Sequence, residues 1–115
     1  MAEILFSYSE NEKSKIWEKA RPYGTNDPGI WRVDTFGAVI RFDAYGNCEH
    51  KYGWEVDHIK PKSEGGSDEP ENLRPLYWKN NRARNQEPDG NGDKVFYKYD
   101  QNKEGNFTEA KMKDR

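Results

Sequence analysis

The chain has 115 residues, which is the usual size of one domain, and its composition limits the core that it can build. Apolar residues make up 32% and charged residues 35%, so a small core must rely on large aromatic side chains. The net charge of −2 argues against a protein that coats nucleic acid through overall positive charge. Cys48 is the one cysteine, which excludes an internal disulfide and a Cys-x-x-Cys zinc pair.

Nothing in the sequence indicates insertion into a membrane. No stretch stays apolar over the roughly 18 residues of a membrane span. The N-terminus lacks both the positive start and the apolar run of a secretory signal. We therefore expect a soluble, cytoplasmic protein that folds as a single domain over residues 1–115.

A helix followed by a loop is predicted for the first 30 residues. Residues 3–8 fit a short strand or an extended arm. Ser9 lies three residues before Glu12, as in a capping box, which predicts a helix that ends near Lys19 or Ala20. The Gly- and Pro-rich run that follows predicts the loop.

A β-hairpin is predicted for residues 31–42. Two runs with apolar residues lie on either side of Phe36 and Gly37, and this pattern is typical of two strands around a bend. A further strand is predicted at residues 95–99. Residues 100–115 are polar, and we expect them to form a flexible tail or a short helix.

Residues 54–59 are rich in β-branched and aromatic side chains, which predicts another strand. Alternation along a strand places Trp54, Val56 and His58 on one face. Asp57 then points to the opposite face, unless a bulge or the end of the strand brings Asp57 and His58 to one site. The sequence alone leaves both arrangements open.

A second helix is predicted after Pro75, because proline lacks the N–H that has no intrahelical partner at a helix start. We expect this helix to begin at Leu76 or Tyr77 and to end near Gln86. Segment 72–86 contains four basic residues and no acidic residue, which predicts a local basic face. Helical spacing places the following residues on one side: Tyr77, Asn81, Arg84 and Asn85.

Four short motifs follow one another across the strand, a loop and the second helix. They are Asp57-His58, Gly65-Gly66-Ser67-Asp68, Asn72-Leu73-Arg74-Pro75-Leu76 and Asn80-Asn81-Arg82. In order and spacing they resemble the HNH endonuclease family, in its Asp-His…Asn…Asn variant. The resemblance implies an α+β fold with a small ββα-metal (His-Me finger) core over about residues 54–86. The N-terminal helix and the additional β-hairpin are expected outside that core.

The chemistry of the motif residues suits hydrolysis of a phosphodiester bond. A histidine, whose ordinary pKa is about 6.5, can accept a proton from water at neutral pH. A divalent cation can stabilise the charge on the phosphoryl group and on the leaving oxygen. Carboxylate and carboxamide oxygens are hard ligands that suit Mg²⁺ or Mn²⁺.

The resemblance assigns a role to each of these residues. It implies that His58 is the general base and that Asp57 and Asn81 are the two metal ligands, with Asn80 as the alternative if the helix register differs by one. It also implies that Asn72 is the central Asn of the motif and belongs with His58 to the catalytic set. In that role Asn72 holds the strand that carries the base in place. An asparagine as the final ligand favours Mg²⁺, with Mn²⁺ as a second ion that supports activity.

Basic residues near the motif are candidates for contacts with phosphates that flank the cut. Arg82 and Arg84 are the first candidates, and Arg74 and Lys60 are weaker ones. Many members of the family hold a structural zinc ion through Cys-x-x-Cys knuckles, which this chain lacks. We expect the additional hairpin and its aromatic residues to brace the site instead.

These observations predict a metal-dependent endonuclease that nicks or cuts DNA. Two alternatives remain open: a non-catalytic nucleic-acid-binding module on the same scaffold, and a nuclease that acts on RNA or needs a partner protein.

Overall fold

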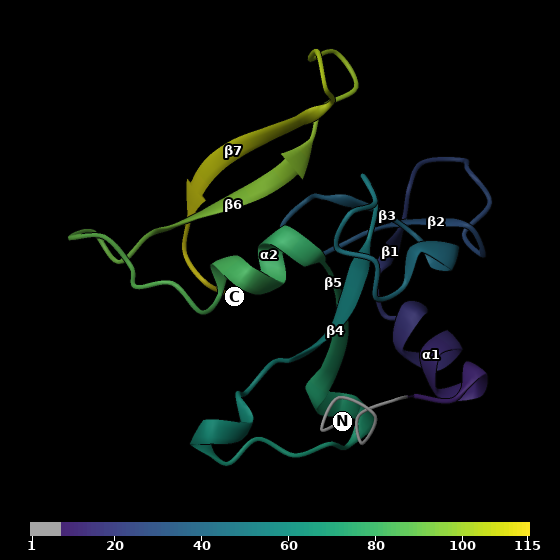
Figure 1. The fold of residues 1–115 in the computed structure, drawn as a ribbon, viewed down its shortest axis with the longest axis horizontal. Coiled ribbons are helices and arrows are strands. Elements are labelled where there is room, and N and C mark those ends of the chain that lie inside the picture. Colours follow the sequence, from purple (N-terminus) through teal and green to yellow (C-terminus); the bar gives the residue numbers. More distant parts are fainter. Residues whose placement is uncertain (1–7) are drawn as a thin grey trace.

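A computed structural model describes residues 8–115, and residues 1–7, which include most of the predicted arm at 3–8, lie outside that part. The described residues form a mixed α+β fold with few helices and several small antiparallel sheets (Figure 1). This confirms the predicted α+β class. No helix among residues 8–115 is long and apolar enough to cross a membrane.

Helix α1 (Glu10–Trp17) begins at the predicted capping box. The Ser9 hydroxyl accepts a hydrogen bond from the Glu12 amide, and the Glu12 carboxylate accepts one from the Ser9 amide. The helix ends before the predicted Lys19 or Ala20, since Glu18 is already its C-cap. Ile16 and Trp17 are its buried residues, and they attach the helix to the core.

The predicted hairpin at residues 31–42 is confirmed. Strands β2 (Trp31–Val33) and β3 (Val39–Arg41) pair antiparallel, and the short strand β1 (Arg21–Pro22), which was not predicted, joins the free edge of β2. The chain bends at Gly37, whose φ of +99° is unfavourable for residues with a side chain.

Strand β4 (Trp54–His58) confirms the predicted strand and pairs antiparallel with β5 (Leu73–Tyr77). Helix α2 (Trp78–Ala83) follows β5 directly. The prediction that Pro75 lies at a helix start is wrong, because Pro75 lies inside β5 opposite Val56. The strand tolerates the proline because β5 pairs with β4 alone, so its second edge needs no N–H donor.

Strands β6 (Lys94–Tyr99) and β7 (Phe107–Met112) form a second hairpin. The strand predicted at residues 95–99 is therefore confirmed, whereas the flexible tail or short helix predicted for residues 100–115 is wrong over β7. Asn106 adopts a φ of +69° in the connecting turn. The hairpin lies beside α2, as Figure 1 shows, and α2 packs more closely against β6 than against β4 or β5.

The core is built on aromatic side chains, as the composition predicts. Trp54 is fully buried on β4 and packs against Trp17, with ring centroids 5.2 Å apart. Phe107 of β7 stacks on Tyr77 at 4.6 Å, and this contact joins the second hairpin to the end of β5. The remaining members of the main cluster are Ile16, Ala20, Ala38, Ile40 and Leu73.

Candidate active site

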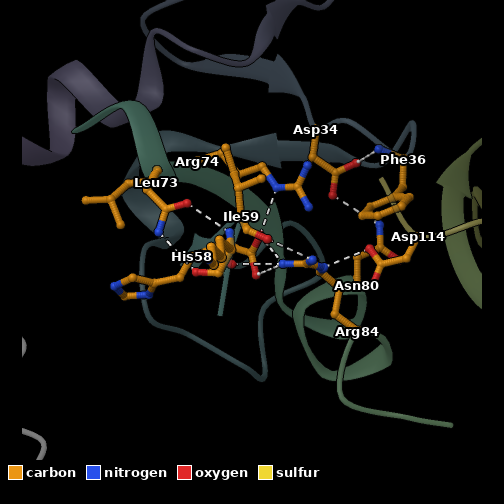
Figure 2. A network of polar contacts seen from close by, with 12 residues as sticks. Asp34, Phe36, His58, Ile59, Leu73, Arg74, Asn80, Arg84 and Asp114 are labelled. Atoms are coloured by element: carbon orange, nitrogen blue, oxygen red, sulfur yellow. Dashed lines mark hydrogen bonds and ion pairs between the residues drawn. The ribbon is translucent and has the colours of Figure 1, made fainter. Parts of the chain in front are cut away.

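Asp57 lies near the end of β4, and its side chain is almost entirely buried. The guanidinium groups of Arg74 and Arg84, both labelled in Figure 2, converge on its carboxylate. Arg74 Nε donates to Oδ2 at 2.8 Å, and Arg84 Nη1 donates to Oδ1 and Oδ2 at 3.0 Å each. Asp57 is therefore an ionic anchor between β4, β5 and the end of α2, besides being a candidate metal ligand.

Arg84 is the centre of the polar network drawn in Figure 2. In addition to Asp57, it donates to the carbonyl oxygens of His58 at 2.9 Å and Ile59 at 3.0 Å, and its Nε donates to Asp114 at 2.8 Å. Burial lowers the pKa of Arg84, but Asp57 and Asp114 outweigh that effect and raise it. The guanidinium holds the end of β4, where the predicted base lies.

Asp114 follows β7 and connects the second hairpin to this network. Its carboxylate also accepts a hydrogen bond from Lys94 Nζ at 3.1 Å. Partial burial raises the pKa of Asp114, yet the hydrogen bonds and charges of Arg84 and Lys94 prevail, so the pKa lies below the ordinary carboxyl value. Asp114 therefore binds Arg84 in its ionised, carboxylate form.

His58 ends β4 and makes a side-chain contact with the loop that follows. Its Nε2 lies 2.7 Å from Asp68 Oδ1, and Lys62 Nζ donates to Oδ2 of the same carboxylate at 3.0 Å. The hydrogen bond with His58, followed by that with Lys62, lowers the pKa of Asp68. When Nε2 carries the proton of this bond, Nδ1 is the nitrogen with a free lone pair.

Asn72 closes the loop between β4 and β5 through its side-chain hydrogen bonds. Its Oδ1 accepts a hydrogen bond from the Lys60 amide at 2.8 Å. Its Nδ2 donates to the carbonyl oxygens of Lys60 and Ser67, at 3.1 and 2.8 Å. The loop is also tight at Gly66, where an added Cβ would lie 1.7 Å from the Lys60 carbonyl oxygen. These contacts fix the backbone beyond His58.

Asn81 of α2 faces β4. Its Nδ2 donates to Glu55 Oε1 at 2.8 Å, and the neighbouring Arg82 pairs with the other oxygen of Glu55 at 3.1 Å. No residue of the described part of the chain donates a hydrogen bond to Asn81 Oδ1. The lone pairs of Asn81 Oδ1 are therefore available to bind a metal ion.

Asn80 points the opposite way and is completely buried. Its Nδ2 donates to Asp34 Oδ2 and to the Tyr97 carbonyl oxygen, and its Oδ1 accepts from the Tyr97 amide. Each hydrogen-bonding atom of this carboxamide has a protein partner. Asn80 therefore offers no unoccupied atom to a metal ion. Its hydrogen bonds join α2 to β6 and to the first hairpin.

Asp34 supplies the bracing predicted for the first hairpin. Its buried carboxylate accepts hydrogen bonds from the amides of Phe36, Ala38 and Tyr77 and from the side chain of Asn80. Burial raises the pKa of Asp34, and these four donors oppose the rise. The loop between β2 and β3 is thereby joined to the start of α2.

Asp57, His58 and Asn81 line one open hollow of about 790 Å³, together with Lys60 and Arg84. The donor types fit a hard divalent ion: one carboxylate, and one carboxamide oxygen without a hydrogen bond. An ion bound to Asp57 would compete with the two arginines for the carboxylate oxygens. Among residues 8–115 no cluster of three His, Cys, Asp or Glu side chains could hold a metal ion.

The four predicted nucleic-acid contacts differ in their accessibility. Arg84 and Arg74 have side chains only 13% and 12% exposed, and both pair with Asp57, so they act mainly inside the protein. The Arg82 side chain is 50% exposed, although it pairs with Glu55. Lys60 is exposed at the rim of the hollow. Of the four, Arg82 and Lys60 face solvent.

Four carboxylates with structural roles at the site had no role in the sequence interpretation: Asp34, Glu55, Asp68 and Asp114. Asp68 belongs to the loop motif, although no role was assigned to it. Glu55 lies two residues before Asp57 on β4, so strand alternation places Glu55 and Asp57 on the same side. Asp34 and Asp114 had no comparable signal, because their partners lie far away in the sequence.

The model of the HNH endonuclease family matches residues 46–87, which contain β4, β5 and α2. The match confirms the family resemblance of the four motifs and indicates a nuclease-type function. Comparisons with curated proteins and with solved structures find no match.

Proposed function

We propose that the protein is a metal-dependent HNH endonuclease that nicks or cuts DNA. The observation that carries the proposal is the arrangement of Asp57, His58 and Asn81 around one open hollow, within the segment that matches the family. The hollow is open to solvent, so a phosphodiester backbone has access to it. Arg82 and Lys60 provide positive charge that faces solvent for that backbone.

His58 is the group that takes the proton from the attacking water. Asp68 holds Nε2 of the imidazole at 2.7 Å and favours the tautomer in which Nδ1 is unprotonated. Nδ1 is therefore the nitrogen that accepts the proton. Arg84 and Asn72 hold the backbone from His58 to Lys60, so that the direction of the imidazole is fixed before the substrate binds.

Asp57 and Asn81 would hold one divalent ion, with Mg²⁺ preferred and Mn²⁺ as a substitute. The ion, when bound, supplies positive charge to the phosphoryl group and to the leaving oxygen. Asn81 offers Oδ1, and Asp57 offers a carboxylate that is already oriented by Arg74 and Arg84. The products would carry a 5′-phosphate and a 3′-hydroxyl group.

The test uses supercoiled plasmid DNA with the purified protein in Mg²⁺, in Mn²⁺ or in EDTA. We expect metal-dependent conversion to open-circle or linear DNA, and its loss in His58→Ala. The matched control is His50→Ala, because His50 accepts a hydrogen bond from the Tyr52 amide in a turn and does not line the hollow. Conversion that persists in His58→Ala, or that His50→Ala removes equally, contradicts the assignment of the base.

A non-catalytic nucleic-acid-binding module is the second candidate, because both oxygens of Asp57 accept hydrogen bonds from arginines. This candidate predicts binding that depends on Arg82 and Lys60 without cleavage in any metal. A structured RNA substrate in the same assay tests for an RNA nuclease. The plasmid assay repeated with a cell extract tests for a nuclease that needs a partner protein.

A further inference from the structure

Glu55 is hydrogen-bonded directly to the candidate metal ligand Asn81. It lies two residues before Asp57 on β4, and its side chain is 22% exposed. Oε1 accepts a hydrogen bond from Asn81 Nδ2 at 2.8 Å. Oε2 accepts one from Arg82 Nη2 at 3.1 Å, and Arg82 Nη1 lies 3.4 Å from Oε1. Both oxygens of Glu55 are thus directed at α2.

We propose that Glu55 is a positioning residue that selects which atom of Asn81 faces the metal ion. This inference rests on the proposed function. A carboxamide has two ends: the oxygen binds a cation, whereas the NH₂ group repels one. An ionised carboxylate accepts hydrogen bonds and donates none, so it pairs with Nδ2 and rejects Oδ1. Glu55 therefore turns Nδ2 toward β4 and leaves Oδ1 for the ion.

Arg82 completes the arrangement by binding Glu55 from the same helix. Its guanidinium also lies over the Trp78 ring, 5.9 Å from the centroid, which limits the positions open to it. The ion pair keeps the Glu55 side chain close to α2 and partly neutralises it. Glu55 can then orient Asn81 from outside the set of metal ligands, as partners of ligand side chains do at other metal sites.

The test measures Mn²⁺ binding by calorimetry in the wild-type protein and in three variants, without any nucleic acid. Glu55→Ala removes the acceptor, and we expect Mn²⁺ to bind about tenfold more weakly. Glu55→Gln keeps an oxygen that accepts from Asn81 Nδ2, and we expect affinity within about threefold of the wild type. Glu109→Ala, an exposed glutamate on β7, is the matched control and should bind as the wild type does.

Each other outcome overturns the inference. Equal affinity in Glu55→Ala and in the wild type shows that Asn81 does not need Glu55. An equal loss in Glu55→Gln and Glu55→Ala shows that Glu55 is itself a metal ligand. Wild-type protein that binds no Mn²⁺ removes the metal site of the proposed function, and the inference with it.

A second readout needs no metal and stays valid if Glu55→Ala does not fold. The side-chain NH₂ group of Asn81 gives two proton resonances in ¹⁵N-edited NMR spectra. We expect one of them to be shifted and protected from exchange in the wild type and in Glu55→Gln. Free-carboxamide resonances for Asn81 in the wild type overturn the inference, whether or not the protein cleaves DNA.

Discussion

Asn80 and Asn81 are neighbours on α2, yet their side chains serve opposite sides of the helix. Asn80 is fully buried among Asp34 and the backbone of Tyr97, whereas Asn81 bonds with Glu55 beside the open hollow. One carboxamide therefore fixes the helix, and the adjacent one is free to serve the site.

The two asparagines should respond differently to truncation. Asn80→Ala removes three hydrogen bonds in the interior and leaves buried polar groups without partners, so we expect a loss of about 3 kcal/mol in the free energy of unfolding. Asn81→Ala should cost less than about 1 kcal/mol while abolishing cleavage. Urea unfolding of both variants, with the plasmid assay for Asn81→Ala, checks this pair. Equal losses of stability would contradict the division of roles.

Arg84 should be essential for stability, unlike Arg82 on the same helix. Arg84→Ala leaves the buried Asp57 with Arg74 as its remaining ionic partner, and breaking a buried pair costs about 3 kcal/mol. Arg82→Ala is the matched control, because its half-exposed ion pair is worth less than about 1 kcal/mol. Thermal or urea unfolding measures the difference. An Arg84→Ala variant as stable as Arg82→Ala would show that Asp57 does not need this partner.

Asp114 should make stability depend on pH in the acid range. The pKa of Asp114 is lowered in the folded protein, so the contribution of its carboxylate is fully present above the ordinary value of 3.8. That contribution is lost as the pH falls from 3.8 through the lowered folded pKa. We therefore expect Asp114→Asn to be less stable than the wild type at pH 6. The difference should shrink below pH 3.8 in a series of urea unfolding curves, and a difference that grows toward acid pH would contradict this assignment.

Gly66 should be intolerant of any side chain. A Cβ at this position would lie 1.7 Å from the Lys60 carbonyl oxygen, so the loop behind His58 would have to move. We expect Gly66→Ala to lose more than about 2 kcal/mol of stability and most of the cleavage activity. Gly90→Ala is the control, because its Cβ would meet nothing within 4 Å. Unchanged stability in Gly66→Ala would show that the loop adapts easily.

Local patterns in the sequence predicted much of the fold. The capping box at Ser9, the alternation of β4 and the apolar runs of the first hairpin each act between residues that are close along the chain. Pro75 misled the prediction, because a proline suits either a helix start or an edge strand, and pairing with β4 decides between them.

The sequence named candidate residues for the site but not their contacts. The roles of His58 and Asn72 are those that the resemblance to the HNH family implies. The pairing of Arg84 with Asp57 and Asp114 joins residues 27 and 30 positions apart, which no local pattern specifies. The exposure of the Arg74, Arg82 and Arg84 side chains depends on how distant segments pack, which the local sequence does not specify.

The buried carboxylate of Asp34 affects whether residues 46–87, which match the HNH family, can fold and work apart from the rest of the chain. The segment at residues 46–87 contains the candidate base and metal ligands, but the partners of Asn80 lie outside it, at Asp34 and Tyr97. A peptide of that length is also close to the lower size limit, about 40 residues, of domains that fold alone. Grafting the segment into another protein would therefore transfer the side chains of the site without the framework that orients them. A useful minimal unit must extend from the first hairpin through β7 to Asp114.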